Sequence, residues 1–321
     1  MIRTGKIESF AFGTLLVMGS ILSVHAFFPS FSAENSLASL GSLFQTEKPV
    51  APVVIKTPFQ VPVGMEAKAA YVIDTVTGEV LFSQNATTSL PLASVTKLMT
   101  ALTAYEQVPP STVAAIRLSD IAQEGDSGLL ANERWQLKDL LDFTLLVSSN
   151  DGASALASAS MAFSTSSQDA EVQKSEFVTL MNQKAQRLSL TETYFNNESG
   201  LDVSSTTAGA YGSAKDVSTL FTYILQNHPE MIEATRYERV NFTSIDEFQH
   251  PAKNTNGSVN AIPGIIGSKT GLTDLAGGNL VVGMDIGFGH PVVIAVLGSS
   301  EKGRFTDVEA LASSTLAYFR Q

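Results

Sequence analysis

The sequence predicts a mixed α/β (α+β) fold, in which a central antiparallel sheet is assembled from both ends of the folded region and is flanked by helices. Three observations predict it. A strand–turn–strand pattern opens the region near residue 70, helical patterns fill the middle, and strand patterns return after Ile265. Strands at both ends that enclose a helical middle favour one sheet with helices packed on it.

The elements follow from hydrophobic periodicity and turn residues. The opening hairpin comprises the strand Ala70–Asp74, a turn over Thr75–Gly78 and the return strand Glu79–Phe82. Helical patterns follow at Ser94–Tyr105, Leu137–Val147, Gly152–Met161 and Glu176–Leu188. A second hairpin is expected over Asn279–Asp285 and Pro291–Gly298, with a last helix over Phe305–Phe319. No internal repeat is visible.

Composition excludes several classes of protein. Of the 321 residues, 44% are hydrophobic and 16% charged, which argues against wholesale disorder and against a polytopic membrane protein. The net charge of −11 argues against a nucleic-acid partner, because phosphate binding needs a basic face. The chain has no cysteine, which excludes thiolate catalysis and Cys-based zinc sites, and its four histidines lack metal-ligand spacing. We therefore expect neither a metal nor a cofactor.

The N-terminal region predicts export. Arg3 and Lys6 lie in residues 1–9, which we expect in the cytoplasm, and residues 10–28 contain no charged side chain. The length of residues 10–28 favours an uncleaved anchor, whereas Val24-His25-Ala26 offers a cleavage site for a signal peptide. Both interpretations stay open.

Residues 29–66 are first Ser-rich and then Pro-rich, without a sustained periodic pattern, and predict a linker. Residues 67–321 then form the folded domain. We expect this domain outside the cytoplasm, in the cell envelope, either tethered to the cytoplasmic membrane by residues 10–28 or released after signal cleavage.

The first candidate motif is the Ser-x-x-Lys segment with Ser94 and Lys97. A hydroxyl nucleophile needs a base within hydrogen-bond reach, and helix positions three apart share one face. Spacing alone is weak, because it recurs at Ser299–Lys302. However, Lys97 is the only charged residue between Glu79 and Glu106, so we expect its partial burial and a lowered pKa. The alternative is a serine helix cap whose lysine reaches solvent.

Two further motifs follow. Ser148-Ser149-Asn150 joins two apolar helical patterns, where polar residues are usually caps, and Lys269-Thr270-Gly271 follows a short apolar stretch, where a strand-end turn would also explain it. Each motif is weak by itself. Together, the three occur in the order and approximate spacing that penicillin-recognising serine enzymes require.

From about Lys68 onward, the chain resembles the D-alanyl-D-alanine carboxypeptidase family of low-molecular-mass penicillin-binding proteins. The stretches that carry this resemblance are Ala70–Asp74 with Thr77-Gly78, Leu92–Thr100, Leu145–Asp151, Thr193–Asn196 with Gly200-Leu201-Asp202, Lys269–Leu280 and Lys302-Gly303-Arg304. The resemblance implies a β-lactamase/transpeptidase-like fold and makes residues 67–321 a serine DD-peptidase catalytic domain.

The resemblance also implies four catalytic residues. Ser94 would attack the carbonyl of the penultimate D-alanine, and Lys97 would take the proton of the hydroxyl. Ser148 would relay a proton to the leaving D-alanine, with Lys269 close enough to tune it. Asn150 would hold the substrate's amide or orient Lys97.

The remaining implied residues bind the substrate, together with Lys269. The backbone N–H groups of Ser94 and Leu272 would form the oxyanion hole. Thr270 and Arg304 would hold the terminal carboxylate, while Gly271 would allow close approach of an extended peptide.

The resemblance names the partners and leaves alternatives open. The substrate would be a peptidoglycan stem peptide, β-lactam antibiotics would inhibit covalently, and the membrane would be reached through the N-terminal segment. The family's further β-rich domain and C-terminal anchor do not follow the last expected helix, so a DD-endopeptidase that opens crosslinks remains an alternative. A class A β-lactamase, whose extra glutamate would be Glu192, and an inactive wall-binding module are the others.

Overall fold

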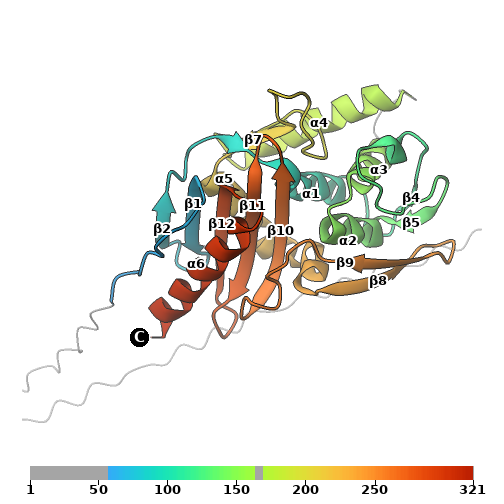
Figure 1. The fold of residues 1–321 in the computed structure, drawn as a ribbon. Helices are drawn as coiled ribbons and strands as arrows, with labels where there is room; N and C mark the ends of the chain where they lie inside the picture. Colours follow the sequence, from blue (N-terminus) through green and yellow to red (C-terminus); the bar gives the residue numbers. More distant parts are fainter. Residues whose placement is uncertain (1–56, 163–168, 321) are drawn as a thin grey trace, which may run out of the picture. The chain divides into compact units, whose positions relative to one another are not determined.

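The structure is a computed structural model that describes residues 57–162 and 169–320 (Figure 1). The predicted cytoplasmic segment, the export segment and the linker as far as residue 56 lie outside the described residues, so those assignments stay predictions. Within the two described ranges, no helix is both long enough and apolar enough to cross a membrane.

A five-stranded antiparallel sheet forms the centre of the domain, in the order β10-β11-β12-β1-β2. Its strands are β1 (Ala69–Asp74), β2 (Val80–Gln84), β10 (Ile265–Thr273), β11 (Gly277–Asp285) and β12 (Pro291–Ser299). Strand β1 pairs with β12 from Ala69 opposite Leu297 to Asp74 opposite Val292. This pairing joins the two ends of the folded region and confirms the predicted sheet (Figure 1).

Helices cover both faces of this sheet. On one face, Val282, Ile294 and Val296 pack with Val308 and Leu311 of α6 (Gly303–Phe319). On the other face, alternate strand residues pack in the larger core with apolar side chains of α5 (Ala214–Asn227). Because successive strand side chains point to opposite faces, a sheet covered on both faces has almost continuously apolar strands.

The helical region packs in the same core as α5 and lies beside β10. It comprises the 3₁₀ turn η1 (Ala93–Thr96) and the helices α1 (Lys97–Gln107), α2 (Leu137–Val147), α3 (Asn150–Met161) and α4 (Ala170–Arg187). The junction of α2 and α3 is sharp, since Ser148 has a left-handed backbone (φ 62°) and the Ser149 side chain caps α3 by accepting from the Gly152 N–H at 2.8 Å. Strand β10 lies beside η1, and its Lys269 donates a hydrogen bond to Ser148 at this junction.

The remaining elements are short. They are β3 (Leu90–Pro91), β4 (Val113–Ala115), η2 (Asp120–Ala122), β5 (Arg134–Gln136), β6 (Tyr194–Phe195), β7 (Ala210–Gly212), η3 (Pro229–Met231), η4 (Glu233–Arg236), β8 (Arg239–Thr243) and β9 (Gln249–Lys253).

Helix α5 is a long element that the periodicity did not predict. It contains β-branched residues, including Val217, Thr222 and Ile224, which weaken helix propensity. Its apolar face packs in the core, and tertiary packing supplies most of the stability of such a helix.

The last residues assigned to the linker pack against this domain. The Phe59 ring stacks on Phe82 with ring centroids 6.1 Å apart, and the N–H groups of Glu66 and Ala67 donate to the Asp307 carboxylate at 3.1 and 2.9 Å. The domain boundary at residue 67 remains a prediction.

Candidate active site

Lys97 connects three segments of the chain at the start of α1. Its Nζ donates hydrogen bonds to Ser94 Oγ at 2.9 Å, Asn150 Oδ1 at 2.6 Å and the Ser199 carbonyl at 2.7 Å. The lysine is 0% exposed, so the interpretation in which it reaches solvent is wrong. These three acceptors use all three donors of an ammonium group.

Burial changes the acid–base chemistry of this lysine. Desolvation lowers the pKa of Lys97 to about 7, and the negative charge of Glu198 opposes that shift. A lysine with such a pKa is neutral in a large fraction of molecules near neutral pH. In that form its lone pair can accept the proton of the Ser94 hydroxyl, whose oxygen lies 2.9 Å from Nζ. The Ser94–Lys97 pair therefore has the geometry and the basicity for nucleophilic catalysis.

The turn that carries Ser94 lies between a loop and two strands. Gly200 approaches it so closely that a Cβ there would lie 2.0 Å from the Ala93 carbonyl oxygen, and a Cβ at Gly271 on β10 would lie 2.8 Å from the Leu92 oxygen. Asn279 of β11 donates from Nδ2 to the Pro91 carbonyl at 2.9 Å. Close backbone approach from both sides holds the turn, which requires glycine at these two positions.

The second motif presents its side chains towards the first and third motifs. Ser148 is the residue after α2, and its Oγ accepts a hydrogen bond from Lys269 Nζ at 2.8 Å. Asn150 begins α3 and donates from Nδ2 to the Glu124 carbonyl at 2.7 Å. That bond orients the amide so that Oδ1 faces Lys97, which matches the orienting role considered for Asn150.

Lys269 is as buried as Lys97. It is 1% exposed, and it also donates to the Thr270 carbonyl at 2.9 Å. Desolvation lowers the pKa of Lys269 well below its ordinary value, and the positive charges of Lys97 and Arg304 lower it further. Two lysines and an arginine thus share one site, where each charge disfavours the others.

The third motif lies on β10, an edge strand of the sheet, and Arg304 joins it from α6. The guanidinium donates from Nη1 to the Gly271 carbonyl at 2.7 Å, and its central carbon lies 4.7 Å from the centroid of the Phe305 ring. Its Nε is buried and has no partner among the described residues. Thr270 Oγ1 lies 2.6 Å from Thr255 Oγ1.

All nine residues that the sequence predicts for the site therefore lie in one connected group: Ser94, Lys97, Ser148, Asn150, Lys269, Thr270, Gly271, Leu272 and Arg304. Leu272 is 43% exposed, and the group predicted to act at this position is its backbone N–H rather than its side chain. The individual roles remain predictions, including the oxyanion hole and the carboxylate contacts.

Sequence reasoning missed several contributors. The Ser199 and Glu124 carbonyls hold Lys97 and Asn150, and backbone acceptors carry no side-chain signal. The loop Gly200-Leu201-Asp202 was recognised only through the family resemblance, yet its close approach to Ala93 positions the nucleophile. The glycine at position 200, next to Ser199, was the available signal.

Two other features bear on groups considered in the sequence. Glu192 is exposed, its N–H donates to Asp216 and its carbonyl accepts from Ser89, as expected of a turn residue. Among the described residues, no group of three or more His, Cys, Asp or Glu could hold a metal ion.

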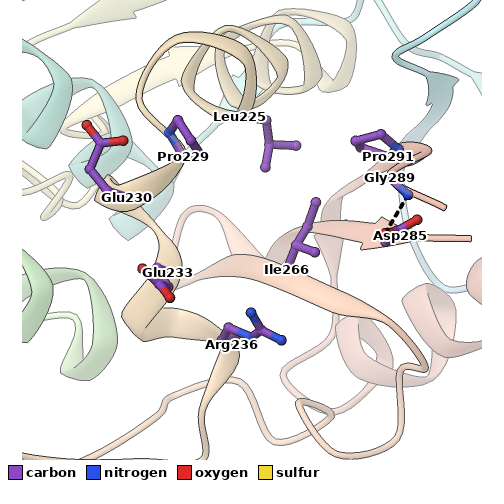
Figure 2. A pocket seen from close by; sticks show the side chains of 9 residues that line it. All are labelled: Leu225, Pro229, Glu230, Glu233, Arg236, Ile266, Asp285, Gly289 and Pro291. Atoms are coloured by element: carbon purple, nitrogen blue, oxygen red, sulfur yellow. Dashed lines mark hydrogen bonds between the residues drawn. The ribbon is translucent and has the colours of Figure 1, made fainter. Parts of the chain in front are cut away.

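A further pocket of about 460 Å³ lies towards the opposite end of β10 (Figure 2). Ile266 lies between Glu230, Glu233 and Arg236 on one side and Asp285 on the other. The Asp285 carboxylate is already used by backbone N–H groups of the β11–β12 turn, including that of Gly289 at 3.1 Å. None of the nine predicted site residues lines this pocket.

A buried Ser-x-x-Lys pair, a Ser-x-Asn turn and a Lys-Thr-Gly edge strand, arranged on a five-stranded antiparallel sheet, define the class of penicillin-recognising serine peptidases. The comparison with protein families agrees with this class. The chain belongs to the peptidase S11 family, D-alanyl-D-alanine carboxypeptidase, whose family model matches residues 56–301.

Relatives with known names support this membership. The D-alanyl-D-alanine carboxypeptidase DacF of Bacillus subtilis is 32% identical over 65% of this chain and 51% of that protein, so the chain spans about half the length of DacF. DacB2 of Mycobacterium tuberculosis is 30% identical over 72% of this chain and 74% of that protein. A D-alanyl-D-alanine endopeptidase of Pseudomonas aeruginosa is 28% identical over 84% of each.

Solved structures share the fold. Penicillin-binding protein D2 from Listeria monocytogenes, in its ampicillin-bound form, is 29% identical with a TM-score of 0.64 over 79% of this chain and 99% of that chain. The D-alanyl-D-alanine carboxypeptidase from Mycobacterium tuberculosis is 26% identical with a TM-score of 0.69 over 80% of this chain and 93% of that chain. These likenesses confirm the predicted transpeptidase-like fold.

Proposed function

We propose that this protein is a serine-type D-Ala-D-Ala carboxypeptidase that trims peptidoglycan stem peptides through an acyl-enzyme on Ser94. One observation carries the proposal. Lys97 is fully buried, has a pKa of about 7 and lies 2.9 Å from the Ser94 hydroxyl oxygen, as a general base for that hydroxyl must. Membership of the D-alanyl-D-alanine carboxypeptidase family supports the choice of substrate.

In the proposed acylation step, Ser94 Oγ bonds to the carbonyl carbon of the penultimate D-alanine and its proton passes to neutral Lys97. Asn150 and the Ser199 carbonyl hold Lys97 in place. The oxyanion that forms accepts hydrogen bonds from the N–H groups of Ser94 and Leu272, and loss of one such donor costs about 3 kcal/mol of barrier.

Release of the leaving group needs a proton on its amine. Ser148 relays it: the hydroxyl gives its proton to the amine and takes one from the Lys269 ammonium that already donates to it, and the proton that Lys97 took from Ser94 later restores Lys269. The free D-alanine then departs. Water then attacks the ester on Ser94 and regenerates the hydroxyl. Arg304 pairs with the terminal carboxylate and Thr270 donates a hydrogen bond to it. A mid-chain peptide bond lacks this carboxylate, so the two contacts select for cleavage at the end of the stem.

The test measures free D-alanine released from a synthetic stem pentapeptide by chromatography. We expect release by the wild type and none by Ser94→Ala, with both proteins showing the same unfolding temperature. Release by Ser94→Ala, or no release by a folded wild type, would contradict the proposal.

A DD-endopeptidase is the second candidate, because the Pseudomonas aeruginosa relative bears that name and matches this chain over 84% of each protein. Both reactions bring a D-alanyl carbonyl to the same serine. Digestion of purified, crosslinked peptidoglycan separates them, since a carboxypeptidase shortens pentapeptide stems whereas an endopeptidase lowers the crosslinked fraction.

The proposal extends to inhibitors and location. β-Lactams would acylate Ser94, and the ampicillin-bound and cefotaxime-bound forms of penicillin-binding protein D2 support this. The domain would work outside the cytoplasmic membrane, tethered by residues 10–28 or released after signal cleavage, as the uncharged run behind Arg3 and Lys6 indicates. Membrane fractionation of cells that express the full chain tests the location.

A further inference from the structure

A polar pocket of about 390 Å³ lies between α4 and the segment from Tyr194 to Glu198. Glu198 lines this pocket and is 5% exposed. Its carbonyl accepts a hydrogen bond from Thr100 Oγ1 at 2.5 Å. Its carboxylate, by contrast, receives no hydrogen bond from the part of the chain that the structure describes.

Two amide side chains that line the pocket are already hydrogen-bonded. Asn182 exchanges two hydrogen bonds with the backbone of Phe195, both at 2.9 Å. Asn197 accepts from the Gly200 N–H at 2.7 Å and donates to the Leu201 carbonyl at 2.9 Å. These amides form rigid walls and have little capacity left for pairing with Glu198.

The pocket has an excess of negative charge. Lys174, the cation that lines it, lies 3.8 Å from Glu171, whose side chain is 85% exposed at the rim. The three charged side chains that line the pocket therefore sum to −1. The Glu198 carboxylate has no hydrogen-bond donor among the described residues, so a positively charged partner that enters the pocket and donates to it is stabilised.

We propose that this pocket binds a primary ammonium group, with the Glu198 carboxylate as its partner. An ammonium is compact and has three donors, which suits a single carboxylate between fixed amide walls. A metal ion would need more ligands, and no described group of three His, Cys, Asp or Glu provides them.

The pocket is connected to the catalytic pair through the residue that follows Glu198 in the chain. Ser199 follows Glu198 and accepts from Lys97 through its carbonyl. The charged groups that act on this centre are Glu198 from the loop, Lys269 from β10 and, beyond it, Arg304 from α6. Glu198 raises the pKa of Lys97, so a cation at Glu198 leaves more of Lys97 neutral below pH 7 and speeds acylation there. This consequence rests on the proposed function, whereas binding itself does not.

The ammonium could come from two sources: the side-chain amine of a diamino acid in the stem peptide, or a free amine. The first experiment uses propylammonium chloride as the probe, with sodium chloride at equal ionic strength as its control. Binding is measured by nuclear magnetic resonance shifts and by unfolding temperature on Ser94→Ala, which needs no chemistry. The variants are Glu198→Gln and, as a matched control at the rim, Glu171→Gln.

We expect propylammonium to raise the unfolding temperature of Ser94→Ala and of its Glu171→Gln derivative, and to leave the Glu198→Gln derivative unchanged. With Ser94 intact, it should increase the rate of acylation by a fluorescent penicillin at pH 6 several-fold, and Glu198→Gln should acylate faster without it. Equal responses of the Glu198→Gln and Glu171→Gln proteins would overturn the proposal.

A second experiment distinguishes the sources by comparing stem pentapeptides with lysine or norleucine at the third position. If the substrate supplies the amine, the lysine peptide has the lower KM and Glu198→Gln removes the difference. If a free amine is the ligand, propylammonium binds but the two peptides have equal KM. Absence of both effects rejects the pocket as an ammonium site, and it does so even if penicillin labels Ser94 normally.

Discussion

Two serines in this chain lie three positions before a lysine, and their surroundings differ completely. Ser94 accepts a hydrogen bond from Lys97, which is 0% exposed and also contacts Asn150 and Ser199. Ser299 instead donates to the Asp307 carboxylate at 2.8 Å, and Lys302 is exposed at the start of α6.

The difference shows what converts a common spacing into a catalytic pair. At Ser299 the hydroxyl donates to the Asp307 carboxylate, which also accepts from the N–H groups of Glu66 and Ala67, so this serine belongs to a structural contact between β12, α6 and the start of the domain. At Ser94 the partner is a desolvated amine whose pKa is lowered to about 7. Burial of the lysine, rather than its position in sequence, creates the base.

The sharpest test of this comparison exchanges each serine for alanine. We expect Ser94→Ala to lose covalent labelling by a fluorescent penicillin completely, because the hydroxyl is the nucleophile. Ser299→Ala should keep full labelling and lose about 1 kcal/mol of unfolding free energy, because one buried hydrogen bond is removed. Gel fluorescence and denaturant titration measure the two quantities, and labelling of Ser94→Ala would break the distinction.

The next largest effect concerns the lysines. Lys97→Gln removes the base but keeps amide donors for Asn150 and Ser199, so the acylation rate should fall about 10²- to 10⁴-fold with the fold intact. Lys302→Gln changes an exposed side chain and should leave the rate unchanged. Stopped-flow acylation by a chromogenic cephalosporin measures both, and similar rates for the two variants would show that Lys97 is not the base.

A smaller effect is the pH dependence of acylation. Lys97 must be neutral to accept the Ser94 proton, so the rate should rise as pH increases through about 7 and should fall about tenfold per unit below that value. The Lys302→Gln protein should show the same profile. A rate that stays constant from pH 5 to pH 8 would contradict the assignment of the lowered pKa to the catalytic base.

Much of the architecture was predictable because its signals are local. The helix over Leu137–Val147 begins and ends where its periodicity predicts, and both long hairpins lie within a few residues of their expected bounds. The nucleophile segment differs from the helix predicted over Ser94–Tyr105, because a 3₁₀ turn precedes α1 and Ala93 has a φ of 48°. That conformation depends on distant parts of the chain. The backbone approaches the turn closely at Gly200 and Gly271, and Asn279 donates a hydrogen bond to it.

By itself, the sequence determined which side chains are available for the chemistry and indicated, through the absence of charge around it, that Lys97 would be buried. Only the tertiary structure decided what Lys97 contacts. Its partners Asn150 and Ser199 lie 53 and 102 residues away, and the second of them acts through a backbone carbonyl. Spacing and composition report on neighbours along the chain, whereas the pairing of a buried charge depends on packing between segments that no local pattern connects.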